Sequence, residues 1–472
     1  MADDLIYTNG INGLTGEYLV PPLPPAEMAQ RARQAPVDPE VALWMKQALD
    51  NLRERHFGLP FNIDPAKVAE AGWAIVFAKD AGAEVERELE PLIEHRRRQI
   101  GDKVKVLDYF PDETWHEWLA RHRVGPGNID PSKVPYYVLL IGRPSAIPFS
   151  FQYLLDVEYA VGRLHFDDAD GYRRYAEALI DYEESPATPR DRTAAFFGTR
   201  HSFDGATQLS ADRLVQPLAE SFAAGGQFAD AVPGHEIHTV LGKPATKASL
   251  AELLAGAGSA GRPALVFSAT HGLGGWPPDH PDQTAKHGAL LCQDWPGFGQ
   301  IIPRQYFAGA DLTTDARVHG MVAFLFACYG AGTPQRDPFA HGSDTPPPLV
   351  ATEPFVAGLP KSLLSHPEGG ALAVIGHIER AWGYSFMFGD TAQLLPFQNA
   401  VGRILTGHPV GFSMKDFNEK YAALSANISD ILEMIGAGRV VSDAQIARLW
   451  TERNDAQNYV LLGDPAVTLK VS

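Results

Sequence analysis

Cysteine is nearly absent from this chain, which has only two among its 472 residues, Cys292 and Cys328. Two cysteines cannot build a disulfide framework or a four-cysteine zinc site. Such scarcity is typical of a reducing compartment, and it predicts a cytoplasmic location. The sequence also lacks any run of about 18 apolar residues, so we expect no membrane span. Residues 1–5 lack the basic and apolar regions of a signal peptide.

Basic residues are outnumbered, because 40 Lys and Arg stand against 57 Asp and Glu, for a formal net charge of −17. Phosphate binding requires clustered Lys and Arg, so we expect no nucleic acid as a main ligand. The one dense basic cluster, residues 96–98, follows Glu94, and mixed charge of this kind is typical of an exposed helix face. With 45% hydrophobic and 21% charged residues, the composition is that of a folded globular protein.

Short apolar runs alternate with helix-like segments along most of the chain. The expected strands are residues 73–78, 103–107, 136–141, 193–197, 236–240, 264–269, 321–327 and 371–375. The expected helices are residues 84–99, 112–121, 170–183, 211–224 and one capped by Thr246. This alternation predicts an α/β fold with a mainly parallel sheet sandwiched by helices. It is built either as two side-by-side units or as one long sheet made of two halves.

Composition divides the chain into four regions. They are an N-terminal extension (1–70), a first α/β unit (71–190), a second unit (191–390), and a helical segment with a closing strand at 459–469 (391–472). The proline-rich extension reads as an arm that is a candidate to block or brace the site. Five prolines within residues 334–348 predict a long irregular loop, a candidate for processing or switching.

Two of the apolar segments end abruptly at residues that can do chemistry. Residues 264–269 lead through one threonine to His271 and Gly272, and residues 321–327 lead to Cys328. The carboxyl ends of parallel strands meet at one edge of a sheet, where ligands bind. We therefore expect His271 and Cys328 to lie near one another.

This pair suits nucleophilic catalysis. A nearby imidazole lowers the pKa of a thiol or accepts its proton, and it can then protonate a leaving amine. Gly272 lets the backbone approach a substrate closely, and its amide with that of Cys328 is a candidate oxyanion hole. A lone cysteine after a strand is usually a buried hydrophobe, and a lone histidine there is usually a loop residue. Their joint placement favours catalysis.

Other polar groups carry weaker signals. His280, Asp282 and His287 are metal-ligand types, but their proline-containing segment suits a surface loop. Residues 235–238, His-Glu-Ile-His, lack the spacing of a zinc-protease helix. The sequence has no Gly-x-Ser-x-Gly elbow and no phosphate-binding loop with Lys-Ser/Thr. Cys292 reads as structural. We therefore expect no metal and no cofactor.

A hydrophobic block followed by His-Gly, and a later block followed by Ala-Cys, is the signature of the peptidase clan of caspases, legumains, separases and gingipains. This chain has both, at His271-Gly272 and Ala327-Cys328. Its surroundings most resemble the gingipain-type family. The further matching segments are residues 137–142 with Ile147 and Pro148, residues 159–164 with Tyr182 and Glu183, and residues 461–466. The resemblance spans residues 70–472 in patches.

The resemblance implies a caspase-like fold with two subdomains, in which residues 71–190 are noncatalytic and residues 191–390 carry a His–Cys dyad. The residue before the scissile bond, called P1, enters a pocket that in this clan is partly built by the strand matching residues 369–382. Trp382 resembles the aromatic cover of that pocket, although loop packing is an equal interpretation. The candidate acids for a basic P1 residue are Glu379, Asp337 and Asp279. Glu379 also suits a solvated surface acid, and Arg380 favours an acidic P1 residue instead.

We therefore predict a cysteine endopeptidase with a basic P1 preference, acting on a protein or peptide substrate. A regulatory partner or activator is expected, although the sequence does not identify one. From this sequence we expect no signal, propeptide or immunoglobulin-like segment of the gingipain kind, so family analogy suggests a regulated bacterial proteolytic or defence pathway. Two alternatives stay open: a caspase-like scaffold without activity, and a Cys–His amidohydrolase or acyltransferase with a non-peptide substrate.

Overall fold

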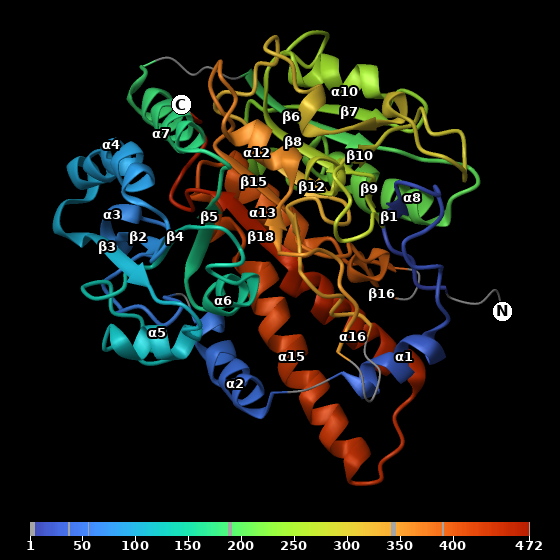
Figure 1. Cartoon of the computed structure of the whole chain (residues 1–472), viewed down its shortest axis with the longest axis horizontal. Coiled ribbons are helices and arrows are strands. Elements are labelled where there is room, and N and C mark those ends of the chain that lie inside the picture. Colours follow the sequence, from blue (N-terminus) through green and yellow to red (C-terminus); the bar gives the residue numbers. More distant parts are fainter. Residues whose placement is uncertain are drawn as a thin grey trace.

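One central sheet of ten strands organises the molecule. The computed structural model describes residues 5–35, 38–54, 56–186, 191–340, 346–388 and 391–471. The sheet strands are β2 (Trp73–Ala78), β3 (Val104–Tyr109), β4 (Tyr137–Ile141), β5 (Ala160–Leu164), β6 (Asp191–Gly198), β7 (Glu236–Leu241), β8 (Pro263–Ala269), β12 (Val322–Phe326), β15 (Ala373–His377) and β18 (Tyr459–Gly463). Their spatial order is β3-β2-β4-β5-β18-β15-β12-β8-β6-β7, as Figure 1 shows.

The sheet consists of two parallel halves joined by the last strand of the chain. Strand β18 pairs parallel with β5 and antiparallel with β15, whereas every other neighbouring pair is parallel. The prediction of a mainly parallel α/β sheet is confirmed, in the form of one long sheet with two halves. Because the halves run in opposite directions, the carboxyl ends of β8 and β12 lie at the edge opposite to those of β2 and β4.

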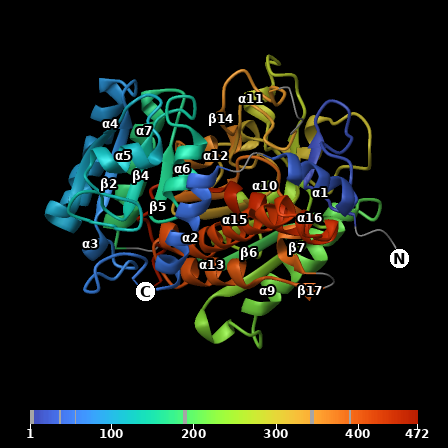
Figure 2. The same ribbon diagram turned by 90° about the horizontal axis from the view of Figure 1, so that it is seen from below.

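Burial explains which strands the apolar pattern identified. All residues of β2, β4 and β12 are buried, as expected for parallel strands covered on both faces. The edge strands β3 and β7 contain exposed positions, which reduces their apolar character. Helices cover both faces of the sheet, so the central strands read as continuous apolar runs (Figures 1 and 2).

The helices predicted at 84–99, 112–121 and 170–183 correspond to α4, α5 and α7, with ends that differ by at most three residues. The helix bounds are α1 (Pro25–Gln34), α2 (Pro39–Arg53), α3 (Val68–Ala71), α4 (Ala83–Ile100), α5 (Trp115–Arg121), α6 (Phe149–Leu155), α7 (Ala169–Glu184), α8 (Gly205–Ser210), α9 (Gln216–Phe222), α10 (Lys247–Leu254), α11 (Gln283–Lys286), α12 (Gly358–Leu364), α13 (Leu395–Leu405), α14 (Val410–Ser413), α15 (Lys415–Gly436) and α16 (Asp443–Asn458). Helix α15 packs against α16 and α2, and α1 packs against α16 (Figure 2). Thr246 caps α10 as predicted, accepting from the amide of Ser249 at 3.1 Å.

Two segments differ from the expectation. The helix predicted at 211–224 is the end of a longer helical stretch, which begins with α8 and passes through a π-helical turn at Ala211–Val215. Asp204 caps α8 because its carboxylate accepts from the amides of Ala206 and Thr207. The closing strand predicted at 459–469 ends at Gly463, where the chain turns into Asp464.

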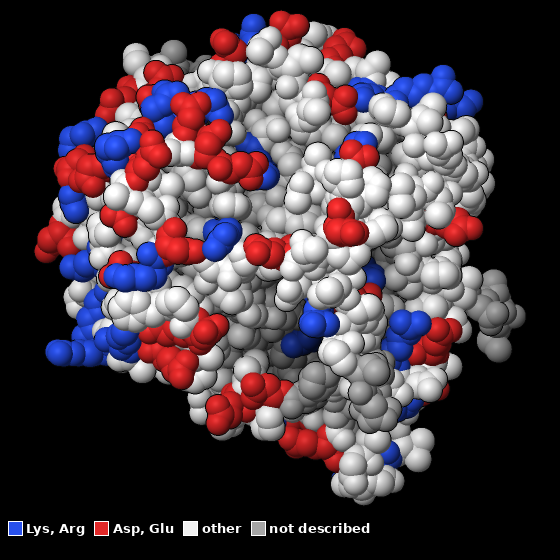
Figure 3. All heavy atoms as spheres, in the orientation of Figure 1, with Lys and Arg blue, Asp and Glu red and all other residues white. Residues whose placement is uncertain are grey.

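The arginine cluster at 96–98 is only partly the exposed helix face that its charge pattern predicts. Arg97 and Arg98 are exposed, but Arg96 is buried. Its guanidinium donates to the carboxylates of Asp464 at 2.8 Å and Glu183 at 2.8 Å, which offsets the cost of burying the charge. Figure 3 shows side chains of both signs interspersed over α4 and α7.

A second, smaller sheet lies beside the carboxyl ends of β8 and β12. Its order is β1 (Gly10–Asn12), β9 (His271–Gly274), β10 (Leu290–Leu291) and β11 (Tyr306–Phe307). Two further two-stranded sheets pair β13 (Gly332–Thr333) with β14 (Phe355–Val356) and β16 (Met387–Phe388) with β17 (Thr391–Ala392). The predicted loop at 334–348 is described up to residue 340 and from 346 onward. Within the described ranges, no helix combines the length and apolar character needed to cross a membrane.

Candidate active site

The ends of β8 and β12 bring His271 and Cys328 to the same edge of the central sheet. The two strands are parallel neighbours, with Ala269 opposite Phe326. The amide of Thr270 still donates to the carbonyl of Phe326 at 3.2 Å, so the pairing continues past both strands. His271 and Cys328 follow at matching positions two residues beyond the paired Ala269 and Phe326.

Gly272 is glycine because the backbone of Cys328 passes directly against it. A Cβ atom at position 272 would lie 1.8 Å from the Cys328 carbonyl oxygen, a distance that no side chain tolerates. This close approach explains why glycine follows the histidine, and the sequence alone does not reveal it. It also places the amides of Gly272 and Cys328 so that both donate to one oxygen, the carbonyl of Asn9, at 2.9 and 3.1 Å.

Asp204 is the partner of His271. Its Oδ2 atom lies 2.7 Å from His271 Nε2, and both side chains are fully buried. Burial alone would raise the pKa of Asp204, but the electrostatic interaction with His271 and the hydrogen bonds from His271, Thr207 and Tyr18 outweigh it and lower that pKa strongly. The other ring nitrogen of His271, Nδ1, has no hydrogen-bond partner in the described part of the chain.

Asp204 is not among the site residues predicted from the sequence. A usable signal exists, because Asp204 follows β6, the strand beside β8, and stands where an N-cap residue precedes a helix. A carboxylate at the carboxyl end of a neighbouring parallel strand is a natural partner for a histidine at the same sheet edge.

The thiol of Cys328 is completely buried. Its Sγ accepts a hydrogen bond from the amide of Ala381 at 3.3 Å. Burial raises the pKa of the Cys328 thiol to about 12, and the Ala381 amide opposes this only in part. Cys292 is a second buried free cysteine, whose Sγ lies 3.4 Å from the carbonyl oxygen of Leu290. Burial raises the pKa of Cys292 as well, so both thiols are protonated and shielded in this conformation.

Shielding of Cys328 comes from the N-terminal strap, which we define as residues 5–23. The strap runs across the carboxyl ends of β8 and β12, near β1 and α8 in Figure 1. Its β1 strand pairs parallel with β9, setting Gly10 opposite Gly272. The Tyr18 hydroxyl donates to Asp204, and the Leu19 side chain reaches Gly10. The sequence interpretation of an arm that blocks or braces the site agrees with this path.

Two of the three acids predicted to line a P1 pocket are paired with Arg380. Arg380 forms a two-point contact with Asp337, at 2.7 and 2.8 Å, and a further buried pair with Glu379. Burial opposes the charge on Asp337, yet Arg380 outweighs it and lowers the pKa of Asp337. Burial raises the pKa of Glu379 despite the same arginine. Asp279 is exposed. Neither Glu379 nor Asp337 therefore presents an unpaired negative charge.

Trp382 packs within a cluster of aromatic residues. Its ring centroid lies 5.0 Å from that of Phe339 and 6.5 Å from that of Trp450, and its side chain is 1% exposed. The backbone of Trp382 nevertheless pairs with the strap, through an antiparallel bridge to Thr8. The side chain fits the loop-packing interpretation, while the backbone lies beside the candidate site.

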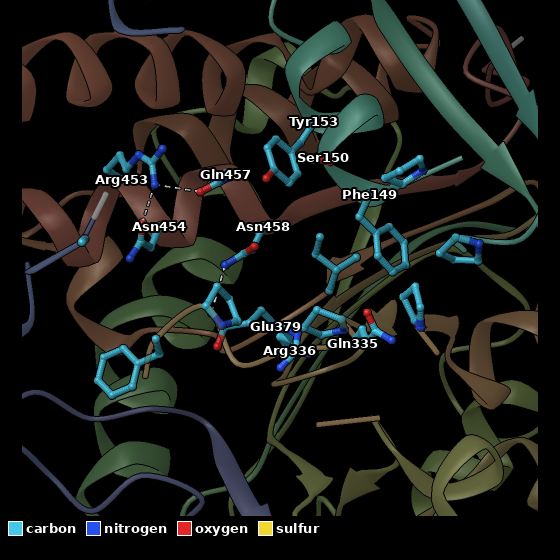
Figure 4. A pocket seen from close by; sticks show the side chains of 18 of the residues that line it. Phe149, Ser150, Tyr153, Gln335, Arg336, Glu379, Arg453, Asn454, Gln457 and Asn458 are labelled. Carbon is cyan, nitrogen blue, oxygen red and sulfur yellow. Dashed lines mark hydrogen bonds between the residues drawn. The ribbon is translucent and has the colours of Figure 1, made fainter. Parts of the chain in front are cut away.

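A cavity of about 430 Å³ lies next to Glu379, between α6, α16 and the segment that begins at Pro334 (Figure 4). Its polar lining includes Arg336, Glu379, Arg453 and Asn458, and Asn458 donates to Glu379 at 3.2 Å. Neither His271 nor Cys328 lines this cavity. We therefore treat it as separate from the candidate active site.

The described residues contain no cluster of three or more His, Cys, Asp or Glu side chains arranged to hold a metal ion. Among the metal-ligand types noted in the sequence, His280 and His287 have hydrogen-bond partners within the protein. His280 Nδ1 accepts from the amide of Asp282 at 3.2 Å, and His287 Nδ1 lies 3.1 Å from the Thr333 hydroxyl. Burial lowers the pKa of His287 to about 3, so this side chain is neutral.

Comparison with known proteins identifies a fold. No family model matches the chain, and no curated protein matches it. The chain is similar to a solved structure described as "Structure of Protease", with 12% identity, a TM-score of 0.50, and coverage of 85% of this chain and 79% of that one. It is also similar to the Saccharomyces cerevisiae separase–securin complex, with 12% identity, a TM-score of 0.29, and coverage of 92% of this chain and 23% of that one. The similarity to the first structure is a similarity of fold. The TM-score with the second structure is too low to support any argument.

Proposed function

We propose that the protein is a cysteine peptidase of the caspase-like type, with Cys328 as nucleophile and His271 as proton acceptor and donor. One observation carries the proposal: a peptide carbonyl, that of Asn9, accepts from two backbone amides, one of which belongs to the cysteine itself. Two amides converging on one carbonyl are the arrangement that stabilises the oxyanion of an acyl-transfer reaction. The protease-like fold supports the same function.

Each group has a defined part in the proposed reaction. The Cys328 sulfur attacks the carbonyl carbon, while the amides of Gly272 and Cys328 stabilise the charge that develops on the oxygen. His271 takes the thiol proton and delivers it to the departing amine. Asp204 is a positioning residue, because its hydrogen bond to Nε2 leaves Nδ1 of His271 for proton transfer.

The wider predictions remain parts of this proposal. We assign residues 191–390 as the catalytic unit and residues 71–190 as the noncatalytic one, with a protein or peptide as substrate. Two free thiols accord with the predicted cytoplasmic location. A basic P1 residue stays a prediction, although Arg380 already pairs with Glu379 and Asp337.

The test is cleavage of fluorogenic peptides with Arg, Lys, Asp, Leu or Asn at P1 by the native chain and by two variants. We expect Cys328→Ala to abolish cleavage, and Cys292→Ala, which removes the other buried thiol, to retain it. Labelling of Cys328 by an acyloxymethyl ketone provides a second readout. A native chain that cleaves no peptide and takes up no label contradicts the proposal and favours a scaffold.

A further inference from the structure

The strap lies in the candidate site as a peptide substrate would. On the amino side of Asn9, its backbone is extended and pairs with residues 381–383: the Asn9 amide donates to the Ala381 carbonyl at 2.9 Å, and the Gly383 amide donates to the Tyr7 carbonyl at 3.1 Å. Addition of a strand in this way is a recurring mode of peptide recognition. The strap therefore occupies backbone positions that a bound substrate needs.

The bond after Asn9 is the one presented to the thiol. The Asn9 carbonyl oxygen occupies the cradle formed by the Gly272 and Cys328 amides. The next residue, Gly10, lies against the nucleophile, since a Cβ there would be 2.7 Å from Cys328 Sγ. Glycine is the residue whose lack of a side chain allows this approach. With the Asn9 carbonyl oxygen on the two amides and Gly10 against the sulfur, the Asn9–Gly10 bond lies beside Cys328.

The Asn9 side chain is buried, its Nδ2 contacts neutral oxygens, and its Oδ1 has no hydrogen-bond partner in the described part of the chain. It is 0% exposed, and its Nδ2 donates to the Ser210 hydroxyl at 3.2 Å and to the Thr270 carbonyl at 3.4 Å. The Ser210 hydroxyl itself donates to the carbonyl of Thr207, so it presents a lone pair to Asn9. Both contacts therefore require a donor. An amide supplies one, whereas an ionised carboxylate does not.

We propose that the Asn9–Gly10 bond is a self-cleavage site and that the enzyme accepts asparagine at P1 of its other substrates. This inference rests on the proposed peptidase function and names its substrate class. A basic side chain is disfavoured in the same position because the recorded contacts of the pocket are neutral oxygens. Release of the segment that ends at Asn9 frees the backbone of residues 381–383 and the Ser210 pocket for a second peptide.

The proposed step is a balanced hydrolysis. The Cys328 sulfur bonds to the Asn9 carbonyl carbon, the bond from that carbon to the Gly10 nitrogen breaks, and His271 passes the former thiol proton to that nitrogen. The resulting thioester then reacts with one water molecule, whose proton His271 accepts, and the thiolate leaves. The products are a carboxylate at Asn9 and an amino group at Gly10.

The primary test follows the intact mass of the purified full chain over time at neutral pH, with sequencing of the new N-terminus. We expect loss of the segment through Asn9, a new terminus at Gly10, and a first-order rate that does not change with protein concentration. Cys328→Ala should remain whole. Asn9→Ala and Asn9→Gln should slow cleavage at least 10-fold, while Asn62→Ala, a change at an exposed asparagine elsewhere in the extension, should leave it unchanged.

A second assay separates this inference from the proposed function. Fluorogenic peptides Ile-Tyr-Thr-Asn, Ile-Tyr-Thr-Asp and Ile-Tyr-Thr-Arg reproduce residues 6–9 with three P1 residues, and we expect the Asn peptide to be cleaved at least 10-fold faster. A native chain that keeps its first nine residues overturns the self-cleavage site. If that whole chain still cleaves the Arg peptide faster, the peptidase function stands and the asparagine preference falls. If it cleaves none of the peptides and leaves the thiol probe unreacted, both proposals fall.

Discussion

His271 and Asp204 form a hydrogen bond of 2.7 Å in which neither side chain has any exposure to solvent. Asp204 comes from the start of α8 and His271 from the start of β9, so two loops after neighbouring strands build the pair. A buried carboxylate with several donors is strongly oriented, and it orients the imidazole in turn.

We expect Asp204→Asn to lower kcat by about 100-fold or more with little change in KM, because an amide cannot balance the charge of a protonated imidazole. Asn remains a good N-cap, so α8 should persist. Asp168→Asn is the matched control, because Asp168 caps α7 and has no histidine partner among its recorded contacts. Peptide cleavage and melting temperature are the measurements. A variant with native kcat would contradict the positioning role.

The same variant has a defined effect on acid stability. Because the pKa of Asp204 is lowered in the folded state, its carboxylate contributes stability above its unfolded pKa of about 4. That contribution is lost as pH falls through the lowered folded value. The difference in unfolding free energy between the native chain and Asp204→Asn should therefore stay constant from pH 6 to about 4 and narrow as the pH falls further. Urea titrations between pH 6 and pH 2 measure this difference, and a difference that stays constant below pH 4 would oppose the assignment.

We expect Gly272→Ala to abolish peptide cleavage and to destabilise the chain by about 1–3 kcal/mol, because the added Cβ collides with the Cys328 backbone. Gly125→Ala is the control, since a Cβ there meets no atom within 4 Å. Peptide turnover and urea unfolding of both variants test this. An active Gly272→Ala enzyme would show that the cradle does not need the observed spacing.

Removal of Arg380, which pairs with both Glu379 and Asp337, should lower the free energy of unfolding. Arg380→Met leaves Glu379 and Asp337 without their cation in a buried setting, and we expect a loss of about 3–5 kcal/mol. Arg143→Met, which breaks an exposed pair with Asp80, should cost less than about 1 kcal/mol. Denaturant unfolding measures both. A loss below about 1 kcal/mol for Arg380→Met would mean that Glu379 and Asp337 are not held by this pairing.

Glu158 should make stability depend on pH near neutrality. Burial raises the pKa of Glu158 to about 7, although the indole of Trp44 donates to it at 3.2 Å. A folded-state pKa above the unfolded value means that the protonated form stabilises the fold, and this stability is lost as pH rises from about 4 through about 7. Glu158→Gln should gain on the order of 2 kcal/mol relative to the native chain between pH 5 and pH 8.

Unfolding free energies of the native chain and Glu158→Gln across this pH range provide the measurement. Glu84→Gln is the control, because Glu84 lies in an exposed pair with Arg87 and should give parallel curves. If the Glu158→Gln and native curves also run parallel, the carboxyl of Glu158 is ionised in the folded state throughout.

Local pattern predicted much of the fold. The strands β2, β4, β8 and β12 are buried on both faces, so each reads as an apolar run that needs no partner to be recognised. Because the carboxyl ends of parallel strands lie at one edge of a sheet, the sequence also predicted that His271 and Cys328 lie near one another. Arg96 shows the limit of such patterns, because the charges that neutralise it come from Glu183 and Asp464, far along the chain.

The sequence by itself determined the alternation of strands and helices and placed a histidine and a cysteine at two strand ends, because these features depend on neighbouring residues alone. Tertiary structure decided the rest. It set β18 between the two halves, joined Asp204 to His271, and paired Arg380 with Asp337. Above all, it laid the Asn9 carbonyl between the amides of Gly272 and Cys328. The contacts of Asn9 join residues hundreds of positions apart, and only the packed chain specifies which donor meets which acceptor.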